Sequence, residues 1–85
     1  MPKVVMYSTN TCPYCSRAER LLSSKGVANI EKIDISGKPV MWKEMERRTG
    51  RNTVPQIYIG DVHVGGCDDL HDLDAAGELD QLLAG

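Results

Sequence analysis

The chain has 85 residues, of which 41% are hydrophobic and 26% charged, and its formal net charge is −2. This length suits one folded domain, and the composition excludes a disordered or low-complexity chain. Residues 1–51 contain ten Lys or Arg and five Asp or Glu, whereas residues 52–85 contain seven Asp or Glu and no Lys or Arg. The basic excess is too small, and too poor in aromatic neighbours, to indicate nucleic-acid binding.

The amino-terminal residues, MPKVVMYSTN, lack the apolar core and the cleavage site of a signal peptide. No apolar run approaches the roughly 18 residues that a membrane span requires. The three cysteines are an odd number, which argues against a secreted disulfide framework. We therefore expect a cytoplasmic protein that does not enter a membrane.

The first half of the chain predicts a strand, a helix and a second strand. Residues 3–7 are apolar and rich in β-branched side chains, as in a buried strand. Residues 13–24 have helical spacing of apolar residues, with Pro13 in the first turn and Gly26 just past the end. Residues 29–35, NIEKIDI, alternate polar and apolar side chains, which indicates a strand. Such a crossover joins parallel strands.

The second half predicts a helix, a hairpin and short helices. Residues 38–49 form the helix, whose apolar side we expect to contain Val40, Met41, Trp42 and Met45. QIYIG and VHVGG read as two strands joined around Gly60 and Asp61. Residues 68–74 and 77–83 read as helical segments. Their buried residues are predicted to be Leu70, Leu73, Leu79, Leu82 and Leu83.

The order β-α-β-α-β-β-α predicts an α/β fold with a four-stranded mixed sheet flanked by helices. We find no linker and no internal repeat, so residues 1–85 are expected to form a single domain.

Cys12 and Cys15 form a Cys-x-x-Cys pair in the stretch TCPYCS. A structural zinc site usually has four ligands in two close pairs, but the other candidates, Cys67, His63 and His71, are scattered. A structural disulfide would close only a four-residue loop and would have to persist in a reducing compartment. Both roles are therefore disfavoured.

A reactive pair fits the spacing better. With Pro13 in the first helical turn, Cys12 becomes the N-cap, where free backbone N–H groups and the positive helix end stabilise a thiolate. The thiolate is the nucleophile, so Cys12 is the predicted attacking residue. Cys15 lies on the same face one turn later and is the predicted resolving residue. Arg17 and Arg20 either add positive potential or are solvated helix charges.

Two further stretches have both a functional and a plain structural explanation. In TVPQIYI, Pro55 either begins a strand or leaves the backbone of the preceding residue free to pair with an extended peptide. In VGGCDDL, the helix that opens at Cys67, Asp68 and Asp69 either has an Asp cap or binds a carboxylate through backbone N–H groups and an ammonium through an Asp.

Taken together, CPYC, TVPQIYI and GGCDDL resemble, in their order and spacing, the motifs of dithiol glutaredoxins of the CPYC type, in particular the small bacterial glutaredoxins of the glutaredoxin 3 type. The resemblance covers nearly the whole chain. It implies a thioredoxin-like fold, a cis peptide before Pro55 and glutathione as the co-substrate, with no metal expected.

The same resemblance implies the glutathione-binding residues, which are Tyr14, Thr53, Val54, Pro55, Gly66, Cys67 and Asp68. By similarity, the backbone of Val54 pairs with the cysteinyl part of the tripeptide. Backbone groups of Gly66 and Cys67, together with Asp68, receive the γ-glutamyl end. Tyr14 and Thr53 line the groove.

The chain departs from the family pattern at Thr9, where the family commonly has a Lys shortly after the first strand. That cation would receive the glycyl carboxylate of glutathione. In its place we expect Arg51, Arg48 or Lys43 to do so, or a weaker hold on the ligand.

The resemblance implies a glutathione-dependent thiol-disulfide oxidoreductase. Cys12 alone reduces protein–glutathione mixed disulfides, and Cys12 with Cys15 reduces protein disulfides. The implied partners are glutathione, proteins with such disulfides, with ribonucleotide reductase as one candidate, and indirectly glutathione reductase and NADPH. We expect a monomer that takes part in electron transport and cell redox homeostasis.

Other cysteine and histidine residues have plainer explanations. Cys67 is expected to be a partly buried small residue beside the site, with a regulatory thiol as the alternative. His63 and His71 are expected to be surface or packing residues. Two other functions stay open, namely an iron–sulfur cluster module and a redoxin that thioredoxin reductase reduces directly.

Overall fold

The computed structural model describes residues 2–84, which form four strands and four helices. In chain order these are β1 (Val4–Ser8), α1 (Pro13–Ser24), β2 (Ile30–Asp34), α2 (Pro39–Thr49), β3 (Gln56–Ile59), β4 (Val62–Gly65), α3 (Cys67–Ala75) and α4 (Leu79–Ala84). Each predicted element is present, with ends that differ from the prediction by one or two residues. No helix of residues 2–84 has the length and apolar character needed to cross a membrane.

The four strands form one mixed sheet in the order β2-β1-β3-β4. Strand β1 is parallel to β2, with α1 as the crossover between them, and antiparallel to β3. The β3–β4 hairpin turns at Gly60 and Asp61, and its register shifts between Ile57 and Tyr58, so that Val64 is an extra residue in β4. The predicted four-stranded mixed sheet is therefore confirmed.

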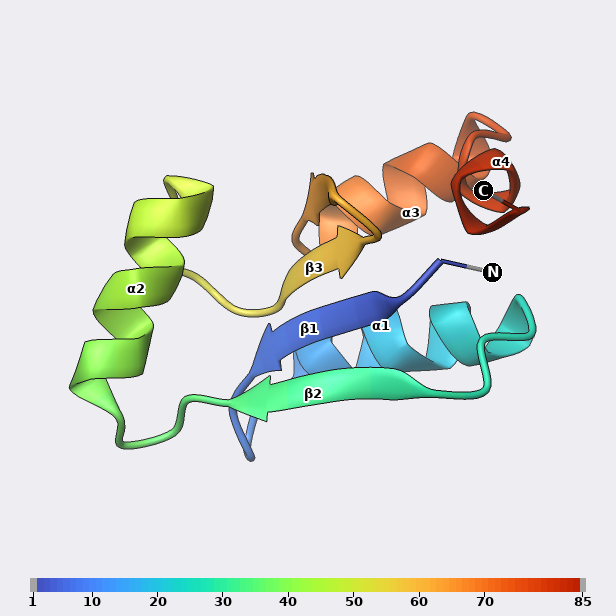
Figure 1. Ribbon diagram of the computed structural model, residues 1–85. Helices are drawn as coiled ribbons and strands as arrows, with labels where there is room; N and C mark the ends of the chain where they lie inside the picture. The colour runs from blue at the N-terminus through green and yellow to red at the C-terminus, as the bar shows by residue number, and fades with distance from the viewer. Residues whose placement is uncertain (1, 85) are drawn as a thin grey trace.

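Helices cover both faces of the sheet (Figure 1). One face packs against α1, α3 and α4 through residues such as Met6, Leu22 and Ile57, all of which are fully buried. The other face packs against α2, where Tyr7, Ile35 and Met45 form a smaller cluster. The active-site candidates lie where β1 passes into α1 and where the chain returns into β3, so the central strands hold them.

One detail of the predicted packing is wrong. Val40 is 78% exposed and does not belong to the apolar side of α2, which consists of Met41, Trp42 and Met45. Strand β2 does not separate polar and apolar faces, because Ile30 packs on the α1 side whereas Ile33 and Ile35 pack on the α2 side. Apolar residues on both faces agree with the position of β2 in a sheet covered on both sides.

Candidate active site

Cys12 is the N-cap of α1, as its position before Pro13 predicts. Its backbone is extended (φ −96°, ψ 107°), and its Sγ accepts a hydrogen bond from the backbone N–H of Cys15 at 3.2 Å. The Sγ also lies 3.8 Å from the carbonyl oxygen of Val54, to which the thiol donates. The sulfur is partly exposed. The N-terminus of α1 thus directs a backbone hydrogen-bond donor at the Cys12 sulfur.

Cys15 lies one turn further along α1 and is 5% exposed. Burial, reinforced by the neighbouring Cys12 side chain, raises the pKa of the Cys15 thiol to about 12. Cys15 is therefore a neutral thiol at physiological pH. The two cysteines of one motif thus differ in chemical character because one caps the helix and the other packs beneath it.

The segment that leads into β3 lies beside Cys12. The peptide bond between Val54 and Pro55 is cis, as the resemblance implies. Val54 is half-buried and Pro55 buried, while Thr53 is exposed at the surface. The carbonyl of Val54 faces the Cys12 sulfur, which brings the backbone of this segment to the reactive atom.

The start of α3 forms the other side of the site. Gly66 is the N-cap, and its backbone N–H donates to the carboxylate of Asp69 at 2.9 Å. Gly65 has a φ of +113°, and a Cβ at this position would collide with the Asp69 carboxylate. The double glycine therefore allows Asp69 to fold back over the helix start. The N–H groups of Cys67, Asp68 and Asp69, in the first helical turn, have no partner inside the helix.

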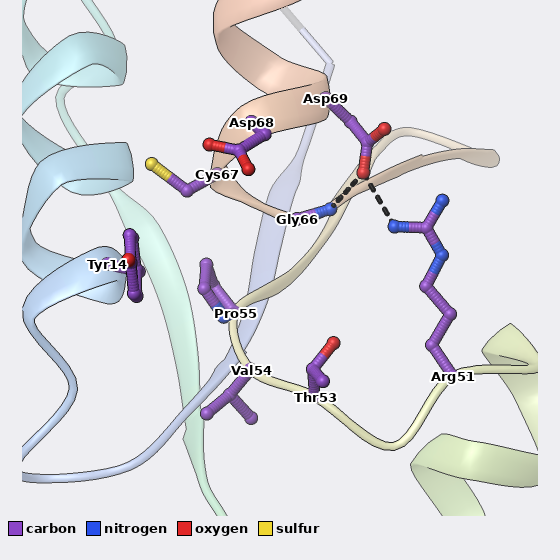
Figure 2. Close-up of a pocket in the computed structure, with 9 residues that line it drawn as sticks. All are labelled: Tyr14, Arg51, Thr53, Val54, Pro55, Gly66, Cys67, Asp68 and Asp69. Carbon is purple, nitrogen blue, oxygen red and sulfur yellow. Dashed lines mark hydrogen bonds and ion pairs between the residues drawn. The ribbon is translucent and has the colours of Figure 1, made fainter.

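Arg51 links the two sides of the site. Its guanidinium donates to the Asp69 carboxylate at 2.6 Å, and Figure 2 shows this ion pair across the mouth of the pocket. The Gly66 hydrogen bond, and then the Arg51 guanidinium, hold the pKa of Asp69 below its usual value. Both groups keep the carboxylate ionised and fix the loop before Thr53 to α3.

These segments enclose a hollow of about 190 Å³. All seven predicted glutathione-binding residues line it, together with Arg51 and Asp69 (Figure 2). Cys12 and Cys15 line a second groove of about 300 Å³ on the other side of the β1–α1 connection. The sulfur of Cys12 therefore lies at the boundary of the two, joined to the first through its contact with Val54.

Of the three cations expected to replace the missing Lys, only Arg51 lines the hollow. Arg48 instead donates to the Tyr7 hydroxyl at 2.5 Å, and its guanidinium lies 5.1 Å from the centre of the Tyr58 ring. Lys43 lies on α2 at a separate surface depression, and Thr9 lines the groove on the Cys15 side. Tyr7 is buried near the end of β1.

Asp69 is the pocket residue that the sequence prediction missed, since only Asp68 was expected to take part. The signal was present in the spacing, because a carboxylate three residues after an N-cap returns to the cap N–H. The carboxylate of Asp68 lies at the hollow beside Cys67 in Figure 2 and is exposed. Both carboxylates thus line the hollow, and that of Asp69 also holds the start of α3 to Arg51.

Cys67 is 6% exposed, and burial raises the pKa of its thiol. Its Sγ lies 3.5 Å from Nδ1 of His71, which also lies 2.9 Å from the Cys67 carbonyl oxygen. The Arg17 guanidinium covers the Tyr14 ring at 5.9 Å. Within residues 2–84 no group of three or more His, Cys, Asp or Glu is arranged to hold a metal ion.

Comparison with known proteins gives a consistent result. The family model "Glutaredoxin" matches residues 4–64. The chain is 56% identical to the glutaredoxin of Pseudomonas aeruginosa over 84 residues, covering 99% of each chain. It is 54% identical to glutaredoxin 3 of Escherichia coli over 83 residues, covering 98% of this chain and 99% of the other.

The fold comparison agrees with the sequence comparison. The crystal structure of a buckwheat glutaredoxin–glutathione complex superposes with a TM-score of 0.89 at 30% identity, covering 98% of this chain and 77% of the other. The thioredoxin-like fold expected from the resemblance is therefore confirmed. On these similarities the chain belongs to the glutaredoxin family, in its small bacterial form, and is a glutathione-dependent thiol-disulfide oxidoreductase.

Proposed function

We propose that Cys12 is the nucleophile and that it reduces protein–glutathione mixed disulfides without help from Cys15. The observation that carries this proposal is the cap geometry, in which the Cys12 sulfur accepts the Cys15 N–H at 3.2 Å while the Cys15 thiol is buried. Of the two cysteines, only Cys12 is partly exposed, so its sulfur is the one that a disulfide would reach.

In this route the Cys12 thiolate attacks the glutathione sulfur of the mixed disulfide. The disulfide bond between the glutathione sulfur and the protein sulfur breaks, the protein leaves as a thiolate and takes a proton, and the Cys12 sulfur becomes bonded to the glutathione sulfur. A second glutathione thiolate then attacks the glutathione sulfur of this new disulfide. Glutathione disulfide is released and the Cys12 thiolate is restored. Glutathione reductase and NADPH return the disulfide to two thiols.

Glutathione would dock in the hollow with its sulfur at Cys12. Val54 would pair its backbone with the cysteinyl unit of the tripeptide, because its carbonyl already lies at the reactive sulfur. The γ-glutamyl carboxylate would bind at the start of α3 through the N–H groups of Cys67 and Asp68, since the Gly66 N–H is occupied by Asp69. The Asp68 carboxylate would receive the ammonium.

The remaining lining residues would shape the groove and complete the charge balance. Tyr14 and Pro55 would line the groove, and Thr53 would offer its hydroxyl. Arg51 would receive the glycyl carboxylate, replacing the Lys that the family commonly has near position 9. Because Arg51 already pairs with Asp69, the ligand carboxylate would share this guanidinium with that side chain.

For protein disulfides we propose the two-cysteine route. Cys12 would attack the substrate disulfide and Cys15 would then attack the Cys12 sulfur, releasing the reduced protein and leaving a Cys12–Cys15 disulfide. The two residues are already in contact through the Cys15 N–H. The partners would be cytoplasmic proteins with exposed disulfides, ribonucleotide reductase among the candidates, and the enzyme would act as a monomer with no resident metal.

A coupled assay tests this function and its main rival. The protein is given the mixed disulfide of cysteine and glutathione, with NADPH and either glutathione plus glutathione reductase or thioredoxin reductase alone. We expect turnover only with the glutathione system. Turnover with thioredoxin reductase alone would instead favour a redoxin that needs no glutathione.

The role of Arg51 is tested by Arg51→Gln, with Arg47→Gln as the matched control on the exposed surface of α2. We expect Arg51→Gln to raise the KM for the mixed disulfide about 3- to 10-fold, as expected for the loss of one charge-assisted contact at a partly exposed site. Arg47→Gln should leave KM unchanged. Equal KM values for Arg51→Gln and Arg47→Gln would show that Arg51 does not bind the ligand.

A further inference from the structure

Gln56 is a fully buried polar residue at the start of β3, directly after the cis proline. Its side-chain Nε2 donates to the carbonyl oxygen of Thr53 at 2.9 Å and to the Thr53 hydroxyl oxygen at 3.3 Å. Its Oε1 lies 2.8 Å from Nε2 of His63 on the neighbouring strand β4. One buried amide therefore joins the edge strand of the sheet to the loop that lines the glutathione pocket.

The chemistry of the partners fixes which way this amide points. The Thr53 carbonyl can only accept a hydrogen bond, so the NH₂ group of Gln56 must face it. The amide oxygen then faces His63, and the ring nitrogen nearest to it must carry a proton. Burial, and then the positive charge of Arg51, lower the pKa of His63, so the ring is neutral at pH 7. The neutral ring is therefore the Nε2–H tautomer, which donates to Gln56.

The His63 ring is itself held in place. Its centre lies 5.1 Å from the centre of the Tyr58 ring, with which it pairs across β3 and β4. The Arg48 guanidinium lies against the Tyr58 ring as well, also at 5.1 Å. The charged groups that act on His63 from the neighbouring segments are Arg51 and Asp69. His63 is thus a fixed donor, although it lies on an edge strand.

We propose that His63 and Gln56 are positioning residues that hold the Thr53–Val54 backbone in the conformation that binds glutathione. This inference rests on the proposed role of Val54 in docking the tripeptide. The segment between Arg51 and Pro55 belongs to no helix or strand, and the Gln56 amide ties its Thr53 carbonyl in place. Because the Thr53 hydroxyl oxygen accepts from Gln56, its own hydrogen is left for a group bound in the hollow (Figure 2).

Loss of the His63 donor would disturb Thr53 through the Gln56 side chain. The Gln56 amide oxygen would be buried without a hydrogen bond, which costs free energy, so rotation of the amide toward other partners would become favourable. Rotation turns the oxygen toward the Thr53 carbonyl, and two acceptors repel. The Thr53–Val54 segment would then be released, although no residue that touches glutathione has been changed.

The test compares His63→Phe with His63→Gln. Phe keeps a ring against Tyr58 but has no donor, whereas Gln keeps an N–H donor at the same reach. Binding of S-methylglutathione, which cannot exchange, is measured by NMR titration in both variants and in the wild type. We expect the Kd to rise about 3- to 10-fold in His63→Phe, the range for loss of one hydrogen bond, and to stay within about twofold in His63→Gln.

Ile33→Ala separates positioning from general stability. Ile33 packs in the same small cluster as Tyr58, but it lies on β2, which β1 separates from β3, and it does not line the hollow. It should lower the free energy of unfolding and leave the Kd unchanged. If His63→Phe lowers stability in the same way and does not change the Kd, the positioning role is wrong. If the wild type itself fails to bind S-methylglutathione, the proposed function fails instead.

A measurement on the unaltered protein keeps the proposal testable if a variant does not fold. Nitrogen NMR of the imidazole groups reports which ring nitrogen carries the proton. We expect His63 to be protonated at Nε2 and unprotonated at Nδ1 at pH 7. The opposite tautomer would mean that the Gln56 oxygen does not face His63. The proposed role of Gln56 in holding the Thr53 carbonyl would then be contradicted.

Discussion

The sulfur of Cys12 lies 3.8 Å from the carbonyl oxygen of Val54, a residue 42 positions away in the sequence. This contact joins the reactive atom at the start of α1 to the backbone of the segment between α2 and β3. A disulfide bound covalently at Cys12 is therefore already beside the polar backbone groups of Val54. The reactive sulfur and the backbone of the segment before β3 therefore meet at one point in the fold.

The burial of Cys15 predicts that this thiol stays protonated as the pH rises through neutrality. Burial, and then the neighbouring Cys12 side chain, raise the pKa of Cys15 to about 12, so its thiolate is absent below about pH 10. We expect Cys15→Ser to show the same ultraviolet absorbance of thiolate as the wild type below about pH 10. A loss of this absorbance in Cys15→Ser would show that Cys15 contributes thiolate in this range.

The hydrogen bonds that Asp69 accepts from Gly66 and Arg51 predict an acid-sensitive contribution to stability. Hydrogen bonding from Gly66, and then from Arg51, lowers the pKa of Asp69 below the ordinary 3.8. Because folding lowers this pKa, the Asp69 carboxylate stabilises the folded state fully above about pH 4. This stabilisation is lost as the pH falls through the pKa of Asp69 in the folded protein. We expect Asp69→Asn to unfold more readily than the wild type at pH 7, and the difference to shrink on acidification. Chemical denaturation at several pH values measures this difference in the free energy of unfolding. A difference that does not change with pH would contradict the stabilising role of the Asp69 carboxylate.

Gly65 and Gly26 form a matched pair for testing the crowded turn before α3. Both have positive φ, but a Cβ at Gly26 meets open space, whereas one at Gly65 meets the Asp69 carboxylate. Gly26→Ala should lower the free energy of unfolding by about 1–2 kcal/mol, the usual cost of this backbone conformation. Gly65→Ala should cost at least about 1 kcal/mol more, because Asp69 must give up its hydrogen bond to Gly66.

The same pair of variants has a functional readout. Gly65→Ala should also raise the KM for the mixed disulfide, since Asp69 and the start of α3 line the pocket, and Gly26→Ala should not. If the two variants lose equal stability and keep equal KM values, Asp69 does not depend on the double glycine.

Much of the fold follows from local signals in the sequence. Pro13 and Gly26 mark the ends of α1, and the Gly60–Asp61 turn marks the hairpin, because these residues act through backbone conformation alone. Val40 shows where such reasoning fails. It lies five residues before Met45, about 140° around a helix, whereas Met41 and Trp42 lie four and three residues before it and share its face. Counting the angles, and not only the apolar residues, would have excluded Val40.

The sequence motifs indicated which residues come together, but not the side-chain contacts between them. Motif spacing located Cys12, Val54 and Gly66, and all three come together. Spacing could not show that Arg51 pairs with Asp69, or that Arg48 is engaged by Tyr7, because these contacts bring together segments distant in the chain. Two adjacent acidic residues on a helix point about 100° apart, and only the tertiary fold decides which of Asp68 and Asp69 pairs with Arg51.

The most direct test of the account is a comparison of Cys12→Ser and Cys15→Ser with the wild type. Each protein reduces the mixed disulfide of cysteine and glutathione, with glutathione, glutathione reductase and NADPH present. We predict that Cys12→Ser loses turnover by at least about 100-fold, as for removal of a nucleophile, and that Cys15→Ser keeps it within a few-fold. Retained turnover in Cys12→Ser, or its loss in Cys15→Ser, would contradict the assignment of Cys12 as the residue that attacks alone.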